Sequence, residues 1–488
     1  MELNNIGKRI FNSTIIYGIG DLITKGAAVL LIPFYTHQLT ASDYGIIASV
    51  GIFSSLLSNA MGLTLGAAIT KMAVDYENPQ EQNDYCGTVF LSGTIWAFFF
   101  AAILTLFGEQ ILAPLFKSIS FDPYLKLGVW ITFFSCSAQI PLALLQIQER
   151  PLAYRFFTFS SFVVTTLLII WFVAFQKEGV LGSLKGQMIG SAIAFIAYTI
   201  FMFINMNFII RLSMLSHAVS FAIPLVLYNF GSFVMVGSGR YFLERYASTD
   251  EVGFYNLAYQ YSAILGMVIA AFNMSWTPIF YKLSRIADGR ATIARVAQLM
   301  VAFSVFIGLG MVLFSPEVFT ILTPKQYHAA VDIVPYLVFV NVLTPAIWVN
   351  LGHAIATQNK NAHLVWITTI SCLVVVVLCV LFVPTRGLMG SAVATLISYL
   401  VFNLLALIIA QKCFYVAYQY YRVLAVIILA ILFISVSTYL SFLPFSTLLA
   451  MRLILLVVQL SATLCLFVDK NDLRYILGLF KIRSAGVG

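Results

Sequence analysis

The stretch HLVWITTISCLVVVVLCVLFV at residues 363–383 decides the fold, because it has the length of a bilayer crossing and contains no Lys, Arg, Asp or Glu. A transmembrane helix needs about 20 predominantly apolar residues. The pattern extends to the whole chain of 488 residues, of which 61% are hydrophobic and 9% are charged. In soluble proteins about a quarter of the residues are charged. The composition therefore excludes a soluble protein and leaves no polar segment large enough for a solvated domain.

Fourteen apolar runs, bounded by charges or by Pro and Gly, predict an all-α polytopic membrane protein with about 14 transmembrane helices. The predicted spans are 13–36, 44–70, 87–108, 124–147, 153–175, 180–205, 216–239, 252–281, 295–315, 329–356, 363–383, 388–411, 422–442 and 447–468. Seventeen of the 27 Lys and Arg residues lie on the side of the membrane where the N-terminus is predicted. Positively charged connectors stay in the cytoplasm, and an even number of spans then places both termini there.

A weak internal repeat predicts two lobes. The matching segments are Asp43-Tyr44-Gly45 with Glu251-Val252-Gly253, Lys71-Met72 with Lys282-Leu283, and Tyr17 to Gly20 with Tyr228 to Gly231. Six spans separate the copies, so the repeats run parallel and are related by an axis along the membrane normal, as in some transporters. We expect two pseudo-symmetric six-helix lobes around a central cleft. The predicted divisions are an N-terminal lobe at 1–212, a C-terminal lobe at 213–412, and helices 13 and 14 with a short cytoplasmic tail at 413–488.

Several function classes are disfavoured by what the sequence lacks. The net charge is +8, but the basic residues are scattered over connectors and form no stripe for nucleic acid. The six cysteines form no CxxC pair, so we expect neither a disulfide nor a metal site. The chain contains no GxxxxGK or HExxH motif, and its predicted external connectors have about sixteen residues or fewer. We therefore expect no enzyme and no cofactor, and rank a membrane-embedded glycan polymerase or ligase low.

Ionisable residues inside predicted spans are the main functional signal, because a charge at mid-bilayer is costly unless it faces protein or water. Asp21 and Lys25 lie four residues apart in the first span, so they share a helix face. One interpretation is a polar stripe that lines the cleft, where Lys25 attracts an anionic substrate. The alternative is a self-neutralising pair that only fixes helix packing.

The end of the seventh span supplies Arg240 and Glu244, which share a face if the helix continues past Gly239. A guanidinium fork matches the oxygens of a diphosphate, which makes Arg240 a candidate substrate-binding residue. The alternative is an outer headgroup anchor in which Arg240 pairs with Glu244.

Polar residues in later spans are further candidates for the cleft. Asn273 lies in the eighth span and His353 in the tenth. Amides inside a membrane bind sugar hydroxyls or hold helices together. His353 is a candidate for a proton-coupled cycle, and the alternative is a hydrogen-bonded structural histidine. Candidate coupling ions are H⁺ and Na⁺.

The densest basic connector runs from Lys282 to Arg295. It suits contact with anionic lipid headgroups and enforcement of topology. A nucleotide or partner site is the alternative.

Two blocks of sequence resemble a known family. They are the segment from Asn12 to Tyr35 with LTASDYG at 39–45, and RYFL at 240–243 with VGFYN at 252–256 and WTP at 276–278. These blocks are similar to the openings of the two lobes in polysaccharide-repeat flippases of the Wzx type. Those flippases belong to the multidrug/oligosaccharidyl-lipid/polysaccharide exporter superfamily.

The resemblance implies a carrier in the bacterial inner membrane that works by alternating access through a V-shaped cleft. Its substrate would be an undecaprenyl-diphosphate-linked oligosaccharide for polysaccharide or O-antigen biosynthesis, turned from the cytoplasmic to the outer leaflet. Lys25 and Arg240 match by position the basic residues thought to meet the diphosphate. Membrane lipids are implied partners, and polysaccharide polymerase machinery is a candidate one. The rival hypothesis is an ion-coupled multidrug or small-molecule antiporter of the same superfamily.

Overall fold

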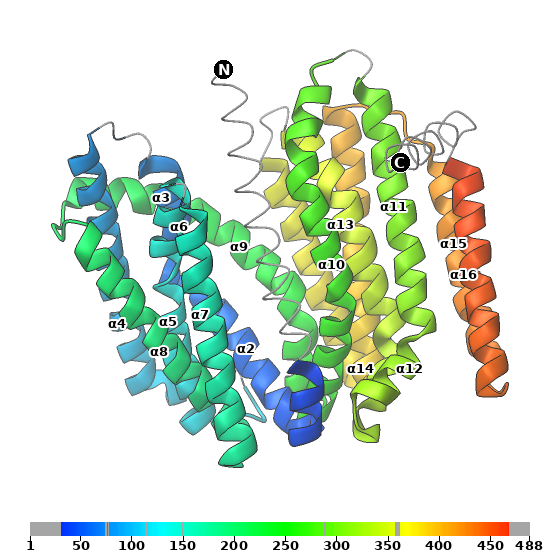
Figure 1. Ribbon diagram of the computed structural model, residues 1–488, viewed down its shortest axis with the longest axis horizontal. Helices are drawn as coiled ribbons and strands as arrows, with labels where there is room; N and C mark the ends of the chain where they lie inside the picture. The colour runs from blue at the N-terminus through cyan, green and yellow to red at the C-terminus, as the bar shows by residue number, and fades with distance from the viewer. Residues whose placement is uncertain are drawn as a thin grey trace, which may run out of the picture. The chain divides into compact units, whose positions relative to one another are not determined.

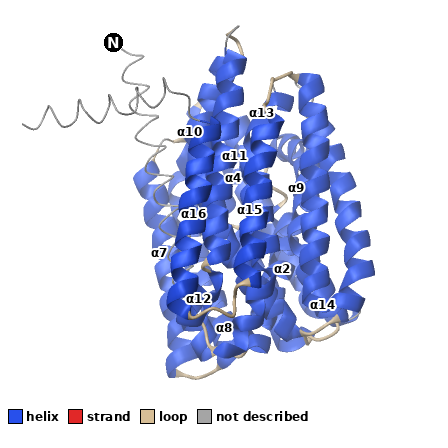
Figure 2. Ribbon diagram, turned by 90° about the vertical axis from the view of Figure 1, so that its right-hand side faces the viewer, coloured by secondary structure: helices blue, strands red, loops and turns tan. Residues whose placement is uncertain are grey.

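The structure is a computed structural model that describes residues 31–73, 76, 78–112, 116–148, 150–286, 289–356 and 362–467. These residues form helices joined by loops and turns, and no strand occurs among them (Figure 1, Figure 2). Nine helices in this part of the chain are long and apolar enough to cross a membrane. The predicted fold class, an all-α polytopic membrane protein, is confirmed.

The helices follow the predicted spans closely from the second span onward. In the first half they are α2 (Ala41–Gly62), α3 (Leu65–Met72), α4 (Pro79–Leu112), η2 (Phe121–Leu125), α5 (Lys126–Cys136), α6 (Gln139–Ile147), α7 (Pro151–Ile170), η3 (Trp171–Phe175), α8 (Gly179–Asn205) and α9 (Leu212–Tyr246). In the second half they are α10 (Thr249–Leu283), α11 (Gly289–Leu313), α12 (Ser315–Leu322), η4 (Lys325–Ile333), α13 (Val334–Ala356), α14 (Ala362–Cys413), α15 (Tyr420–Tyr439) and α16 (Phe445–Phe467).

Interruptions are the main difference between the helices and the predicted spans, and the fourth span is divided between α5 and α6. The second span is split into α2 and α3, because Leu63 and Thr64 adopt left-handed backbone angles with φ of 45° and 53°. The two spans predicted at 363–383 and 388–411 form the single helix α14 of 52 residues. A straight helix of that length would measure about 78 Å. Pro384 lies inside α14 and Gly387 has a φ of 50°, so a kink divides it into two bilayer-sized segments.

The chain packs into two compact units. The first comprises Met1–Tyr261, Leu322–Ile333 and Val365–Ser398, and the second comprises Ser262–Ile321, Val334–Leu364 and Tyr399–Gly488. Large apolar side chains on the outer helix faces are exposed, among them Leu106 and Phe156, as expected where helices meet lipid. The division into lobes at residues 212 and 412 stays a prediction.

The starts of α2 and α10, which the sequence repeat matches with each other, have similar caps. Thr40 caps α2 reciprocally with Asp43, and both of their hydrogen bonds measure 3.1 Å. At the matching position of α10, the Ser248 hydroxyl accepts a 3.2 Å hydrogen bond from the backbone N–H of Glu251. Equivalent residues therefore cap equivalent helices, since Ser and Thr satisfy the free N–H groups of a first turn.

Candidate functional site

The first unit contains a cavity of about 700 Å³. Its walls come from α2, α7, α8, α9 and α10, together with the helical residues 31–38. The polar side chains among its described lining residues are those of Tyr35, Tyr44, Ser55, Thr158, Ser161, Thr165, Thr166, Gln187, Arg240, Asn256 and Gln260. Ligand pockets in proteins span about 300–1,000 Å³, so this space has the size of a binding site.

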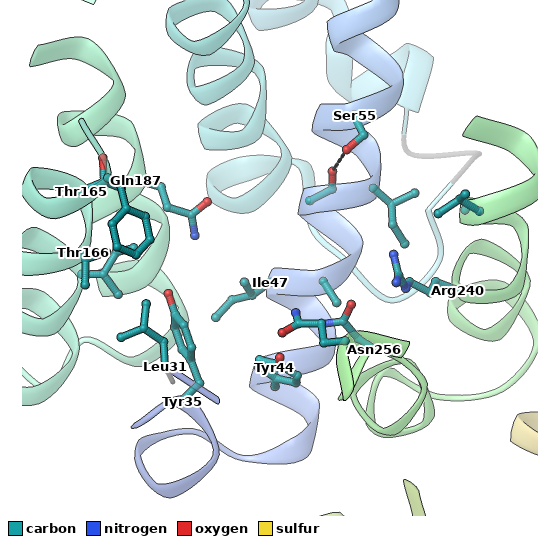
Figure 3. A pocket seen from close by; sticks show the side chains of 18 of the residues that line it. Leu31, Tyr35, Tyr44, Ile47, Ser55, Thr165, Thr166, Gln187, Arg240 and Asn256 are labelled. Atoms are coloured by element: carbon teal, nitrogen blue, oxygen red, sulfur yellow. Dashed lines mark hydrogen bonds between the residues drawn. The ribbon is translucent and has the colours of Figure 1, made fainter. Parts of the chain in front are cut away.

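Helical periodicity places these polar groups on one face of each apolar helix. On α7 the lining residues Thr158, Ser161 and Thr165 follow at intervals of three and four, and α2 contributes Tyr44 and Ser55 three turns apart. Figure 3 shows Thr165, Gln187 and Tyr35 on one side of the cavity and Arg240 and Asn256 on the other. The arrangement makes a polar chamber inside otherwise apolar helices.

Two of the lining hydroxyls donate to the backbone of their own helices. Ser55 Oγ donates to the Gly51 carbonyl at 2.9 Å, and Thr158 Oγ1 donates to the Tyr154 carbonyl at 3.0 Å. These bonds use the hydroxyl proton, so the oxygen lone pairs remain as acceptors. The chamber wall therefore presents acceptor groups that match the hydroxyl donors of a sugar.

Arg240 is the cationic group of the chamber, and only 9% of it is exposed. Its guanidinium carbon lies 4.3 Å from the ring centroid of Tyr259 and 6.0 Å from that of Tyr255. The Tyr255 hydroxyl is fixed by a 2.9 Å hydrogen bond with Thr395 Oγ1. In the described part of the chain, Arg240 makes no ion pair and its Nε has no hydrogen-bond partner. A buried cation held by ring faces keeps its donors for an anion.

The backbone at Gly239 positions Arg240. A Cβ atom on Gly239 would lie 2.8 Å from the Tyr255 hydroxyl oxygen and 2.7 Å from Ser391 Oγ. The missing side chain therefore lets α9 approach α10 closely, which brings the neighbouring Arg240 over the tyrosine rings. The helix also continues past Gly239 to Tyr246, so Arg240 and Glu244 share a face.

Glu244 is 1% exposed and binds a different element from the one expected. Its Oε1 accepts a 2.6 Å hydrogen bond from the backbone N–H of Ser118, whose hydroxyl donates to the Glu244 carbonyl at 3.3 Å. The alternative in which Glu244 neutralises Arg240 is therefore not the arrangement in this structure. Glu244 instead ties the end of α9 to the connector that precedes η2.

Asn273 and His353 come together in the second unit. His353 Nε2 lies 3.3 Å from Asn273 Oδ1 and 3.1 Å from Thr277 Oγ1, and its Nδ1 lies 3.4 Å from the Tyr281 hydroxyl. Thr277 also donates to the Asn273 carbonyl at 2.8 Å. The two predicted residues thus belong to one hydrogen-bonded cluster between α10 and α13. An amide oxygen only accepts, so Nε2 carries the proton and donates, while Nδ1 accepts from the Tyr281 hydroxyl and is the nitrogen that can take up a proton.

Comparison with known sequences identifies the family. The sequence profile of the family described as polysaccharide biosynthesis protein matches residues 10–284, which is more than half of the chain. The chain belongs to this family. The match covers the two blocks on which the resemblance rests and includes Arg240, Glu244 and Asn273.

Two proteins to which this chain is similar come from Haemophilus influenzae. The Lsg locus putative protein 1 is 22% identical over 281 residues, which are 56% of this chain and 66% of that protein. An uncharacterized membrane protein is 24% identical over 277 residues, which are 55% of this chain and 64% of that protein. The matched region thus spans just under two thirds of each relative.

Solved structures share the fold. The lipid II flippase MurJ in an inward closed conformation has a TM-score of 0.70 at 15% identity and covers 95% of this chain and 99% of its own. The MATE transporter VcmN of Vibrio cholerae has a TM-score of 0.59 at 15% identity, and the match covers 84% of this chain and 97% of that one. An inward-facing multidrug resistance MATE transporter of the MOP superfamily has a TM-score of 0.63 at 12% identity, and the match covers 80% of this chain and 97% of that one. This family member is thus a multi-pass membrane protein with the fold of flippases and transporters, which are not enzymes.

The remaining candidates are Asp21 and Lys25, and both lie outside the described residues. Most residues of the chamber wall, including Thr158, Thr165 and Gln187, were not among the predicted site residues. Hydroxyl residues at helical spacing along one face of α7 were a usable signal. They were passed over because Ser and Thr carry no charge and are common in membrane helices.

Proposed function

We propose that this protein carries an undecaprenyl-diphosphate-linked oligosaccharide repeat unit from the cytoplasmic to the outer leaflet of the bacterial inner membrane. The polysaccharide biosynthesis family and the flippase fold support the class of carrier. The observation that carries the proposal is Arg240, a buried guanidinium without a carboxylate partner among the described residues, beside a chamber of about 700 Å³ with polar walls. A glycan for surface polysaccharide or O-antigen is the product that such a carrier would supply to polysaccharide polymerase machinery.

The chamber offers separate chemistry for the two polar parts of the substrate. Arg240 donates to the diphosphate, where guanidinium and phosphate oxygens form paired charge-assisted hydrogen bonds. The hydroxyls of α7 and the amides of Gln187 and Asn256 meet the sugar hydroxyls. Lys25 would add a second positive charge for the diphosphate. The polyprenyl chain stays in the surrounding lipid.

Transport proceeds by alternating access, with both termini in the cytoplasm. In this orientation the starts of α2 and α10 lie at the outer surface, where Ser42 Oγ and Thr249 Oγ1 are 2.6 Å apart. In this proposal the contact forms the outer gate, which opens to release the glycan. The lobes 1–212 and 213–412 move against each other, and 413–488 adds helices 13 and 14 and the cytoplasmic tail.

The His353 and Asn273 cluster couples the cycle to an ion gradient. Protonation of His353 would break the hydrogen bond that its Nδ1 accepts from the Tyr281 hydroxyl and so change the contacts between α10 and α13. H⁺ is the coupling ion that this chemistry favours, and Na⁺ is the alternative.

Deletion of the gene tests the proposed function. We expect loss of surface glycan together with a build-up of the lipid-linked unit, since synthesis continues while translocation stops. Expression of the Arg240→Ala variant in the deletion strain should not relieve the build-up of the lipid-linked unit. Expression of the control variant Arg245→Ala should relieve it. Unchanged surface glycan without any build-up would contradict the proposal.

A second candidate is an ion-coupled antiporter of drugs or small molecules. The observation that favours it is the fold shared with two MATE transporters at TM-scores of 0.59 and 0.63. It predicts that expression of the protein lowers the cellular accumulation of cationic dyes in a gradient-dependent way. The unpaired cation Arg240 argues for an anionic substrate instead, because a cationic drug would be repelled from the chamber.

A further inference from the structure

A second cavity, of about 420 Å³, lies in the second unit, away from the chamber. It is bounded by the first turns of α11, the start of α15, the end of α16 and the connector 414–419. Its polar lining residues are Arg290, Arg295, Arg422, Gln298, Gln419 and Tyr415. None of its described lining residues is acidic, so the local potential is positive.

Two of the three arginines are held in place by contacts that leave donors available. The Arg290 guanidinium carbon lies 4.8 Å from the ring centroid of Phe414, and Arg290 has no hydrogen bond or ion pair within the described residues. Arg422 donates from Nη1 to the Leu466 carbonyl at 2.7 Å and from Nε to the Tyr421 hydroxyl at 3.1 Å. A guanidinium has five N–H donors, so both side chains can still bind an oxyanion.

Gln298 gives an independent indication of a ligand. It is 7% exposed and lines the cavity, and its Nε2 has no hydrogen-bond partner in the described chain. A buried donor without a partner is costly, so most such groups in folded proteins are satisfied by protein, water or ligand. A ligand oxygen in this cavity would satisfy it.

Gln298 also lines an adjoining cavity of about 380 Å³ that is almost wholly apolar. Its apolar walls come from α11, α13, α14 and α15 through Val301, Ile347, Leu351, Leu407, Leu424 and Ile427. A basic cavity and an apolar cavity that share one wall match the two ends of a lipid. The charge of the first selects an anionic headgroup, and the second accommodates an acyl chain.

We propose that these two cavities bind one anionic phospholipid, with its phosphate at Arg290, Arg422 and Gln298 and an acyl chain along α11 and α15. The lipid fills the space at the junction of α11, α15 and α16 and so holds these helices together. This site is separate from the chamber at Arg240 and is independent of the transported substrate.

Native mass spectrometry of the purified full-length protein tests the lipid site. The protein is titrated with phosphatidylglycerol, with phosphatidylcholine of the same acyl chains, with glycerol phosphate and with inorganic phosphate. We expect one phosphatidylglycerol to be retained with at least tenfold preference over phosphatidylcholine. Glycerol phosphate and inorganic phosphate should not displace it at equal concentration, because they lack the acyl chain. Equal retention of the two lipids by the wild-type protein, or displacement of phosphatidylglycerol by inorganic phosphate, would overturn the proposal.

Variants then locate the headgroup. The double change Arg290→Gln with Arg422→Gln should abolish the preference for phosphatidylglycerol. The matched control is Lys282→Gln with Arg285→Gln, which removes the same charge from exposed residues of the neighbouring connector that do not line the cavity. The control should keep the preference. Full retention in the first variant, or an equal loss in the control, would show that the anion does not bind at these arginines.

Discussion

The backbones of Gly45 and Gly253 touch where α2 crosses α10. A Cβ atom built on Gly45 would lie 3.1 Å from the backbone nitrogen of Gly253, and one built on Gly253 would lie 3.3 Å from that of Gly45. The same atoms would overlap the carbonyl oxygens of Thr249 and Ala41, respectively. The contact is therefore reciprocal, as a pseudo-two-fold axis between repeats requires. It gives both glycines of the DYG and EVG segments a packing role.

Replacing Gly45 by Ala should destabilise the protein, because the added methyl group must displace the backbone of α10. Overpacking of this kind costs about 1–3 kcal/mol. The midpoint of thermal unfolding of the purified protein should fall accordingly. Gly266→Ala is the matched control on α10, because a Cβ there meets no atom within 4 Å. If Gly266→Ala loses as much stability as Gly45→Ala, the close approach of the two backbones is not the cause of the destabilisation.

A disulfide between Ser42→Cys and Thr249→Cys should lock the outer gate. The two hydroxyl oxygens are 2.6 Å apart, so sulfur atoms at these positions come within reach of a bond of about 2.05 Å. In a background without the six native cysteines, we expect oxidation to stop glycan export and reductant to restore it. Full export by the oxidised protein would show that the gate does not open during transport.

Loss of the guanidinium in Arg240→Ala should lower export more than tenfold, because a charge-assisted hydrogen bond contributes about 1.5–3 kcal/mol. Arg240→Lys should recover only part of the activity, since an ammonium cannot form the paired contact. Transport rates are measured at equal amounts of protein in the membrane. Normal export by Arg240→Ala would remove this residue from the substrate site.

Substitution of His353 distinguishes a role in coupling transport to an ion gradient from a role in helix packing. His353→Gln keeps a polar side chain beside Asn273 and Thr277 but cannot be protonated near neutral pH. We expect the variant to fold with normal thermal stability and to lose the dependence of transport rate on a pH gradient. A variant with normal gradient dependence and a lower unfolding midpoint would assign His353 a structural role.

A buried ion pair stabilises the second unit. Arg452 of α16 binds Glu317 of α12 and donates to Ser437 Oγ of α15 at 3.1 Å, and the two charged side chains are 6% and 19% exposed. Breaking such a pair from one side costs about 3–5 kcal/mol. Glu317→Gln should thus lower the unfolding midpoint strongly. Replacing both residues by apolar ones, as Arg452→Met with Glu317→Leu, should restore most of it.

The fold was largely predictable because the length and hydropathy of an apolar run identify a helix that crosses the bilayer. Most span boundaries from the second span onward lie within a few residues of a helix end, although α4 begins well before its predicted span and α9 ends well after it. Thr40 and Ser248 mark helix starts through ordinary capping chemistry. The interruptions were less predictable. The α2 break has left-handed angles at Leu63 and Thr64, although the glycines that would adopt such angles most readily are the flanking residues Gly62 and Gly66.

The site was predicted only where a charge drew attention to it. Arg240 was found because a cation in a membrane helix is costly. Its tyrosine partners and the hydroxyl wall of α7 were not found, because their role depends on which helix faces meet across the cavity. The Glu244 contact with Ser118 joins segments 126 residues apart, a pairing that helical spacing cannot reveal.

The most direct test of the central claim is a leaflet assay in reconstituted vesicles. Purified protein is incorporated with a labelled undecaprenyl-diphosphate oligosaccharide, and an externally added glycosidase reports the fraction of glycan on the outside. The proposed function predicts protein-dependent movement across the membrane that Arg240→Ala abolishes and Arg245→Ala preserves. Movement no faster than in protein-free vesicles under H⁺ and Na⁺ gradients of either direction would contradict it.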